Sequence, residues 1–322
     1  MTRVLVTGAS GFVGRALVDR LAADGAVNVR AALRKRSVAM PVGVEIVEVG
    51  NLGESADWSS AVQDVDVVVH CAARVHVMRE SAASAETAYQ RSNVEGTLAL
   101  ARAAAAAGCR RFVFLSSVKV NGEVSGSGTP FRETDLPAPQ DPYGRSKRDA
   151  ERGLMALAED AGLEAVIIRP PLVYGRGVKA NFNTLVRWVR KGVPFPFGAV
   201  DNRRSLVGID NLVDLIILCM THPAAANQIF LVSDGADVSI AQLIRKIAQT
   251  LEVPVRMMTV PTWLLSVVVR LVGRPDLMQR LCGDLQVDIS KARELLGWTP
   301  PLSLDEGLAR LTDAAAEYPD HA

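Results

Sequence analysis

The sequence has few of the residues that build metal centres or disulfide frameworks. Its four cysteines are far apart and form no CxxC pair, and its four histidines show no HxxxH or mixed His/Cys spacing. Metal centres need several such ligands at short spacings, and secreted disulfide scaffolds need many cysteines. The sequence therefore predicts no metal site and a reduced chain in the cytoplasm.

Long runs of charge or of hydrophobic residues are also absent. The formal net charge is +1 without an extended basic or acidic tract, which argues against non-specific binding of nucleic acid or anionic lipid. The most apolar segment, residues 261–272, is interrupted by Arg270 and is shorter than the roughly 20 residues of a membrane span. No charged region precedes a long apolar stretch at the N-terminus, so we expect no signal peptide. These features predict neither a nucleic-acid partner nor membrane insertion.

Short apolar runs alternate with helical patterns through the first half of the 322 residues. Runs such as residues 65–70 are continuous rather than alternating, which is typical of strands buried on both faces of a parallel sheet. We predict strands over 3–6, 27–32, 45–49, 65–70, 111–115 and 165–169, and helices over 15–23, 58–62, 87–107 and 142–161. The pattern predicts an α/β fold with a doubly wound parallel sheet.

A second pattern begins after Arg169, where prolines and glycines punctuate a loop-rich region. One more strand is predicted over 226–232, and helices begin at the capping residues Ser239 and Ser290. We expect a large α/β domain over residues 1–172, to which the chain returns around 205–235. A smaller mixed C-terminal domain is expected over residues 173–204 and 236–322.

Three glycines follow the first predicted strand, in the segment Thr7-Gly8-Ala9-Ser10-Gly11-Phe12-Val13-Gly14. Gly8, Gly11 and Gly14 allow a tight turn, a close approach of the backbone to a pyrophosphate, and close packing of helix on sheet. The helix that follows offers oriented N–H donors at its N-terminus to an anion, and Phe12 and Val13 of this segment are predicted ligand contacts together with the glycines. The loop predicts a phosphate site, and the alternative is a glycine-rich turn without a ligand.

The GxxGxxG spacing of this loop resembles that of the short-chain dehydrogenase/reductase superfamily. The resemblance implies a Rossmann domain with a nicotinamide dinucleotide across the carboxyl edge of its sheet. Arg34, Lys35 and Arg36 follow the second strand, where an acidic residue would hold the adenosine ribose of NAD(H). Cations there favour a ribose 2′-phosphate, so we predict NADP(H) over NAD(H), with Arg34 as the contact. The alternative is that all three are solvated loop charges.

Further cofactor contacts are implied by the resemblance alone. Asn51 stands where the family usually has an aspartate, and its side-chain oxygen still accepts one hydrogen bond. Small residues after the fourth strand leave room for the cofactor, and residues 169–175 resemble the segment that closes over the nicotinamide. The contacts assigned in this way are Asn51, Leu52, Ala72, Ala73, Asn93, Pro170 and Val173.

A serine, a tyrosine and a lysine match the catalytic triad of the superfamily in order and context. Ser117 follows the fifth strand, and Tyr143 and Lys147 share a face at the start of a helix that Asp141 caps. A carbonyl that accepts hydride must take a proton, and a phenol supplies it when a nearby ammonium lowers the phenol pKa from about 10. We predict Tyr143 as proton donor, Lys147 as its tuner and ribose contact, and Ser117 as the donor to the substrate oxygen. Ser116 is the alternative serine.

The chain beyond the triad resembles the extended branch of the superfamily, which includes nucleotide-sugar epimerases, dehydratases and 4-keto reductases. The resemblance implies that Asn181 contacts substrate and that Arg204, with Arg280 as a second candidate, binds the diphosphate of a sugar nucleotide. Lys119 stands where 4-epimerases usually have a small hydroxyl residue, so we expect it in the sugar pocket as a substrate contact. Residues 290–298 resemble the C-terminal signature of the branch.

Three functions are considered on this resemblance. Motifs around Ala73, Ser117 and Gly177 resemble bacterial reductases of O-antigen synthesis, of the UDP-N-acetylquinovosamine dehydrogenase type. They predict NAD(P)H-dependent reduction of the C4 ketone of a UDP-4-keto-6-deoxy-N-acetylhexosamine. The alternatives are a 4-epimerase of UDP-glucose or UDP-N-acetylglucosamine with retained NAD, and a dinucleotide sensor without catalysis. The family also implies a homodimer formed through a four-helix bundle that includes the Tyr143 helix.

Overall fold

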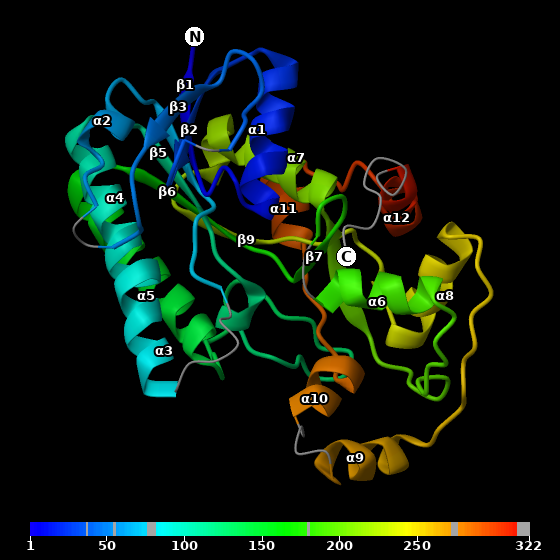
Figure 1. Cartoon of the computed structure of the whole chain (residues 1–322). Coiled ribbons are helices and arrows are strands. Elements are labelled where there is room, and N and C mark those ends of the chain that lie inside the picture. Colours follow the sequence, from blue (N-terminus) through cyan, green and yellow to red (C-terminus); the bar gives the residue numbers. More distant parts are fainter. Residues whose placement is uncertain (37, 54–55, 76–81, 179–180, 272–275, 314–322) are drawn as a thin grey trace.

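The computed structural model describes residues 1–36, 38–53, 56–75, 82–178, 181–271 and 276–313. A large sheet with helices on both faces lies beside a smaller sheet with helices of its own (Figure 1).

The large sheet has seven parallel strands in the order β3-β2-β1-β4-β5-β6-β9. From β1 the chain builds outward through β2 and β3, then crosses back to continue on the other side of β1 with β4. This order confirms the predicted doubly wound fold, which places ligands outside the carboxyl ends of the strands at the point of reversal. The strands are β1 (Arg3–Thr7), β2 (Asn28–Leu33), β3 (Glu45–Glu48), β4 (Val67–His70), β5 (Arg111–Leu115), β6 (Glu164–Arg169) and β9 (Gln228–Leu231).

Both faces of this sheet are buried, and successive strand residues point to opposite faces. Val4 and Val6 join one hydrophobic core, whereas Leu5 joins another. Burial on both faces explains why the strands are continuous apolar runs in the sequence. Figure 1 shows α1 and α7 on one side and α4 and α5 on the other. The covering helices are α1 (Phe12–Asp24) and α7 (Ile209–Thr221) on the first face, and α2 (Ser59–Val62), α4 (Gly96–Ala106) and α5 (Pro142–Ala161) on the second.

Helix α5 begins at the predicted residue because its first turn is capped. Asp141 Oδ1 accepts a hydrogen bond from the Gly144 N–H at 2.7 Å, and Pro142 occupies the first turn. Proline lacks the N–H that would be unpaired at this position, and an aspartate cap satisfies another of the free donors. The cap fixes where Tyr143 and Lys147 lie along the helix.

The single helix predicted over 87–107 is wrong in one respect, because a π-helical segment interrupts it. α3 (Ala82–Tyr89) leads into η1 (Gln90–Glu95), and α4 follows. A π-turn rotates the residues after it and is frequent at functional sites. η1 contains Asn93, whose side chain is hydrogen-bonded to Arg74 and Ser146. We attribute the departure from regular helix to these contacts with distant parts of the chain, which the local period does not encode.

The smaller sheet, in the order β10-β8-β7, starts at the carboxyl edge of the large one. β7 (Leu172–Tyr174) follows β6 after two prolines and runs parallel to β8 (Arg204–Gly208), while β10 (Asp237–Val238) is antiparallel to β8. The core around this sheet includes residues of α6, α8 and α12. The domain boundaries given above stay a prediction.

Further helices complete the described chain. Ser239 forms the predicted cap of α8, in a capping box with Gln242. The predicted cap at Ser290 is wrong, because Ser290 is the first residue of α11 and Ile289 is its N-cap, while Gly297 ends that helix in the left-handed conformation. Within the described ranges, no helix is both long and apolar enough to traverse a bilayer. These helices are η2 (Val118–Val120), α6 (Asn181–Arg190), η3 (Pro223–Ala225), α8 (Ile240–Thr250), α9 (Thr262–Leu271), α10 (Asp276–Cys282), α11 (Ser290–Leu296) and α12 (Leu304–Asp313).

Candidate active site

The glycine loop connects β1 to α1 at the carboxyl edge of the sheet. Gly8 has φ +66°, and a Cβ there would lie 2.7 Å from the Ala72 nitrogen. A Cβ on Gly14 would lie 2.2 Å from the Gly8 oxygen, so the first turn of α1 packs directly on the loop. Phe12 and Val13 are the first residues of α1 and are half-buried. The loop presents a helix N-terminus and close backbone, the arrangement that holds a pyrophosphate.

A pocket of about 520 Å³ lies beside the glycine loop. Its lining includes Ser10 of the loop, Arg34 and Lys35 after β2, and Glu48 and Asn51 at and after the end of β3. The structure thus brings the predicted contacts Arg34 and Asn51 to one pocket. This pocket has the cationic and hydrogen-bonding groups that an adenosine ribose requires, with or without a 2′-phosphate, so the residues present fit a nicotinamide dinucleotide.

Small residues after β4 lie against the glycine loop. The Ala72 N–H donates to Thr7 Oγ1 at 3.3 Å. Asn93 holds the continuation of this turn, because its Oδ1 accepts from the Arg74 N–H at 2.8 Å and its Nδ2 donates to the Arg74 carbonyl at 3.1 Å. Asn93 therefore supports the backbone at the cofactor edge. Leu52 packs against the adjacent core, and Ala73 is half-buried in the turn.

Lys147 is almost completely buried below the end of β5. Its side chain donates through Nζ to the Leu115 carbonyl at 2.8 Å and lies 4.4 Å from the centre of the Phe114 ring. Burial lowers the pKa of Lys147 to about 8, and the negative charge of Glu151 opposes that shift. Lys147 thus remains mainly an ammonium at neutral pH but titrates close to the physiological range.

Tyr143 is half-buried one helical turn before Lys147. Its ring meets that of Tyr89 edge-on, with 6.0 Å between the ring centres. Burial raises the pKa of Tyr143 above its usual value, and the charge of Asp141 raises it further. In this environment the phenol holds its proton, which suits a proton donor. A bound group that brings positive charge would favour the phenolate.

The two serines after β5 have different partners. Ser116 is buried and donates a hydrogen bond to Glu151 Oε1. Ser117 is half-buried, and its Oγ accepts from the Lys119 N–H at 3.2 Å. Because the Ser116 hydroxyl is bonded to a buried carboxylate, this geometry favours Ser117 as the serine for the substrate oxygen.

Glu151 was missed in the sequence, although a spacing signal was available. Tyr143, Lys147 and Glu151 are four residues apart in succession, so they lie on one face of α5. Glu151 is paired with Arg169 at 2.6 Å, and the two side chains are 5% and 3% exposed. Arg169 Nη1 also donates to Asn121 Oδ1 at 3.1 Å. An acidic residue on an otherwise buried helix face is the feature that could have identified this pair.

The segment after β6 joins the site to the smaller sheet. The Val118 N–H donates to the Pro170 carbonyl at 2.9 Å, which fastens η2 beside the chain leaving β6. Val173 lies in β7 and packs against the core of the large sheet. Both predicted contacts therefore lie at the edge where the two sheets meet.

The predicted substrate contacts come from both parts of the chain. Arg204 begins β8, and its Nη1 donates to the Gly283 carbonyl at 2.9 Å. Burial lowers the pKa of Arg204, and the charges of Glu123 and Asp284 oppose this. The side chain of Lys119, on η2, pairs with two carboxylates. Asn181 begins α6 and Arg280 lies in α10, and the side chains of both fall outside the described residues.

Among the residues that the structure describes, no three or more His, Cys, Asp or Glu side chains gather as metal ligands would. The arrangement instead offers a phenol, an ammonium and a hydroxyl at the carboxyl edge of the sheet, and a pocket beside the glycine loop at the same edge. Such groups move a proton to or from an alcohol or ketone while a cofactor takes or gives hydride.

The comparisons with known proteins cover nearly the whole chain. The model of the NAD dependent epimerase/dehydratase family matches residues 4–233. A UDP-glucose 4-epimerase of Vibrio cholerae is 48% identical over 312 residues, or 97% of this chain and 94% of that protein. An N-acetyl-alpha-D-glucosaminyl-diphospho-ditrans,octacis-undecaprenol 4-epimerase of Escherichia coli O157:H7 is 27% identical over 95% of this chain and 93% of that protein.

A solved structure has the same fold over almost all residues. The structure of MoeE5 in complex with UDP-glucose and NAD gives a TM-score of 0.78 at 27% identity and covers 98% of this chain and 99% of that one.

Proposed function

The chain belongs to the NAD-dependent epimerase/dehydratase family, and from this premise we propose that it is a UDP-hexose 4-epimerase that retains its dinucleotide. It is a nucleotide-sugar epimerase/dehydratase-type enzyme that uses NAD(P). The observation that carries the finer assignment is the likeness, over nearly the full length, to the Vibrio cholerae UDP-glucose 4-epimerase. The 4-keto reductase predicted from the sequence has less support than this alternative.

The chemistry that a bound nicotinamide dinucleotide supplies is reversible acceptance of hydride. Gly8, Gly14 and the N-terminus of α1 would hold its pyrophosphate, and the pocket containing Arg34 and Asn51 would hold its adenosine end. Side chains of the protein would carry out proton transfer and hold the sugar nucleotide.

Tyr143 takes the proton of the C4 hydroxyl when the sugar is oxidised, and it returns a proton when the ketone is reduced from the other face. Ser117 hydrogen-bonds the same oxygen, which develops negative charge during both steps. The Lys147 ammonium, one helical turn beyond Tyr143, favours the phenolate form. Arg204 holds the diphosphate by charge, so that the keto sugar turns without leaving the enzyme.

An epimerisation assay with UDP-sugars tests this assignment. Purified protein is incubated with UDP-glucose or UDP-N-acetylglucosamine without added NADH or NADPH, and both C4 epimers are quantified by NMR. An epimerase reaches the same ratio of epimers from either side with no net consumption of dinucleotide. The proposal fails if neither sugar is interconverted while a UDP-4-keto-6-deoxysugar is reduced with one NADPH consumed per sugar.

The 4-keto reductase remains a second candidate because Arg34 and Lys35 line the adenosine pocket. Two cations there favour a ribose 2′-phosphate and hence exchangeable NADPH. If so, Arg34→Asp raises the KM for NADPH by roughly tenfold or more, with little change for NADH. If the cofactor preference of Arg34→Asp is unchanged, Arg34 does not bind a 2′-phosphate, and the argument for NADPH over NAD fails.

We also propose the homodimer that the family implies, formed through the face of α5 and its neighbours. Sedimentation of the purified protein at micromolar concentration tests it, and a monomer contradicts it.

A further inference from the structure

A lysine and two carboxylates form a small charge cluster, of which one carboxylate acts on Tyr143 and the other on Arg204. Lys119 Nζ lies 2.5 Å from Asp141 Oδ2 and 2.9 Å from Glu123 Oε1. The three side chains are 22%, 17% and 14% exposed for Lys119, Asp141 and Glu123. Partly desolvated ion pairs of this geometry interact more strongly than surface pairs.

Asp141 has two tasks because its carboxylate has two oxygens. Oδ1 accepts from the Gly144 N–H at 2.7 Å and caps the helix that carries Tyr143, while Oδ2 is held by Lys119. The cap places a negative charge two residues before the phenol. That charge opposes formation of phenolate, and the Lys119 ammonium is the cation that offsets it.

We propose that Lys119 is a positioning residue for the epimerase proposed above: it orients Asp141 and offsets part of its charge, so that Tyr143 can alternate between phenol and phenolate. This differs from the direct sugar contact expected from the sequence. The inference rests on the proposed function only for its catalytic consequence, because the effect on Tyr143 exists without substrate.

Glu123 extends the cluster toward the diphosphate end of the site. The Ser125 N–H donates to the Asp284 carbonyl at 2.9 Å, and Arg204 donates to the neighbouring Gly283 carbonyl. The charge of Glu123 raises the pKa of Arg204 against the effect of burial. Lys119 and Glu123 therefore join the proton-transfer end and the anion-binding end of the site in one charge network.

Two other charged residues of α5 near Tyr143 are held in ion pairs of their own. Arg145 pairs with Glu86 of α3 at 3.1 Å, and Glu151 pairs with Arg169 of β6. The pKa of Tyr143 is raised first by burial, then by Asp141 and then by Tyr89. The charged and titratable groups nearest the start of α5 include its cap Asp141, Arg145, Lys147 and Glu151 of α5, Glu86 and Tyr89 of α3, Lys119 of η2 and Arg169 of β6.

The test compares Lys119→Met with Lys119→Arg and with the double variant Lys119→Met/Asp141→Asn. The tyrosinate absorbance of Tyr143 is followed against pH, as the difference between each protein and the same protein carrying Tyr143→Phe. Lys119→Met removes the ammonium that pairs with Asp141 and should move this titration to higher pH by roughly one unit. Lys119→Arg should restore it, and so should the double variant, because asparagine keeps the cap without the charge.

The pH profile of kcat/KM for epimerisation is measured on the same proteins. Its acidic limb should move with the tyrosinate titration, because the oxidation step needs the phenolate. Lys246→Met is the matched control, since Lys246 pairs with Asp305 at 2.6 Å between α8 and α12, away from the site.

An unchanged Tyr143 titration in Lys119→Met overturns the proposal, as does a double variant that stays shifted. A rise in the KM of Lys119→Met without a shift of the Tyr143 titration also overturns the proposal, because it indicates that Lys119 contacts the sugar directly. If no UDP-sugar is epimerised, the tyrosinate measurement still decides the question, so failure of the proposed function remains distinguishable from failure of this inference.

Discussion

Strands β5 and β6 lie side by side, and a buried arginine is paired with a glutamate at each end of this pair. At the amino end Arg111 pairs with Glu164, and at the carboxyl end Arg169 pairs with Glu151. The two pairs use the same chemistry within one sheet. Their surroundings differ: one pair lies at the end of a helix, and the other lies beside Lys147 of the proposed catalytic triad.

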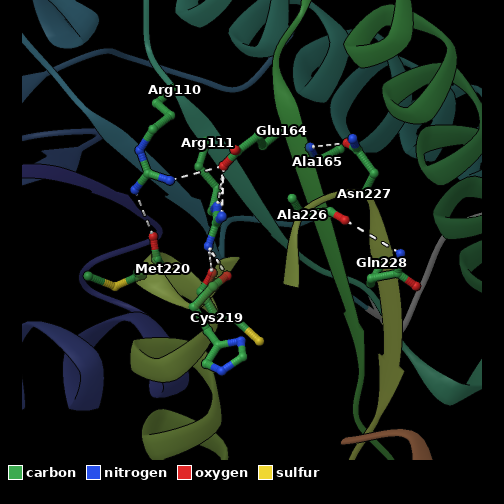
Figure 2. Close-up of polar contacts among 10 residues, drawn as sticks. Arg110, Arg111, Glu164, Ala165, Cys219, Met220, Ala226, Asn227 and Gln228 are labelled. Carbon is green, nitrogen blue, oxygen red and sulfur yellow. Dashed lines mark hydrogen bonds and ion pairs between the residues drawn. The ribbon is translucent and has the colours of Figure 1, made fainter. Parts of the chain in front are cut away.

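The amino end fastens a helix to the sheet. Arg111 Nη1 donates to the carbonyls of Cys219 and His222 at 2.8 Å, and Arg110 donates to that of Met220 at 3.3 Å (Figure 2). These carbonyls end α7, where helix backbone acceptors have no partner in the helix and cations are favoured. Both arginines at this end therefore contact a carboxylate and the carbonyls at the end of a helix.

The carboxyl end places a titrating lysine next to the pair. Glu151 lies one helical turn after Lys147 and counters the effect of burial on its pKa. Glu151 also accepts hydrogen bonds from Ser116 and Arg169, so its buried carboxylate is paired while its charge still acts on Lys147. The two pairs therefore differ in one respect: among the residues that the structure describes, only the pair at the carboxyl end acts on a lysine with a shifted pKa, and such groups are candidates for function.

The largest expected effect is a loss of kcat, which should follow a substitution at the carboxyl end of the strands but not one at the amino end. Tyr143→Phe removes the proton donor and should lower kcat by about 10²–10⁴-fold, while binding of dinucleotide, followed by fluorescence, is retained. Cys219→Ser at the amino end serves as the comparison, since it alters a buried residue of α7 far from the triad. Near-normal turnover in Tyr143→Phe would remove this tyrosine from the proposed mechanism.

The free energy of unfolding should distinguish the two ion pairs, because the glutamate that loses its arginine is buried in one pair and partly exposed in the other. Arg169→Met leaves Glu151, only 5% exposed, without its cation, and should lower the free energy of unfolding by about 3–5 kcal/mol. Arg111→Met leaves Glu164, which is 33% exposed and still paired with Arg110, and should cost about 1–3 kcal/mol.

Urea denaturation measures both variants, with Arg110→Met as the matched control. Arg110 is 47% exposed and bonds the same carboxylate, so its loss should cost less than about 1 kcal/mol. A larger cost for Arg111→Met than for Arg169→Met would reverse the comparison.

The smallest expected effect is a shift of the alkaline limb of the kcat profile. Lys147 has a depressed pKa of about 8, so activity should fall as pH rises through that value and the ammonium is lost. Glu151→Gln removes the charge that favours the ammonium, so the alkaline limb should move to lower pH by roughly one unit. Glu159→Gln, an exposed change on the same helix, should not move it. If the alkaline limb does not move in Glu151→Gln, the charge of Glu151 does not set the pKa of Lys147.

Much of the fold was predictable because its signals are local. The continuous strands, the glycine loop, and the caps at Asp141 and Ser239 each depend on residues close together in the chain. The comparisons support the epimerase alternative better than the predicted 4-keto reductase, since small motifs do not decide which sugar faces the cofactor. The π-turn at Asn93 was missed because contacts with distant residues hold it.

The sequence by itself determined the doubly wound sheet and the placement of Tyr143 and Lys147 on one helix face, because period and capping act over a few residues. Only the tertiary structure decided which charges surround that face. Arg169 meets Glu151 from 18 residues away and Lys119 meets Asp141 from 22. Such pairs form when separate strands and turns converge at one sheet edge, and burial there gives their charges the strength to shift a neighbour's pKa.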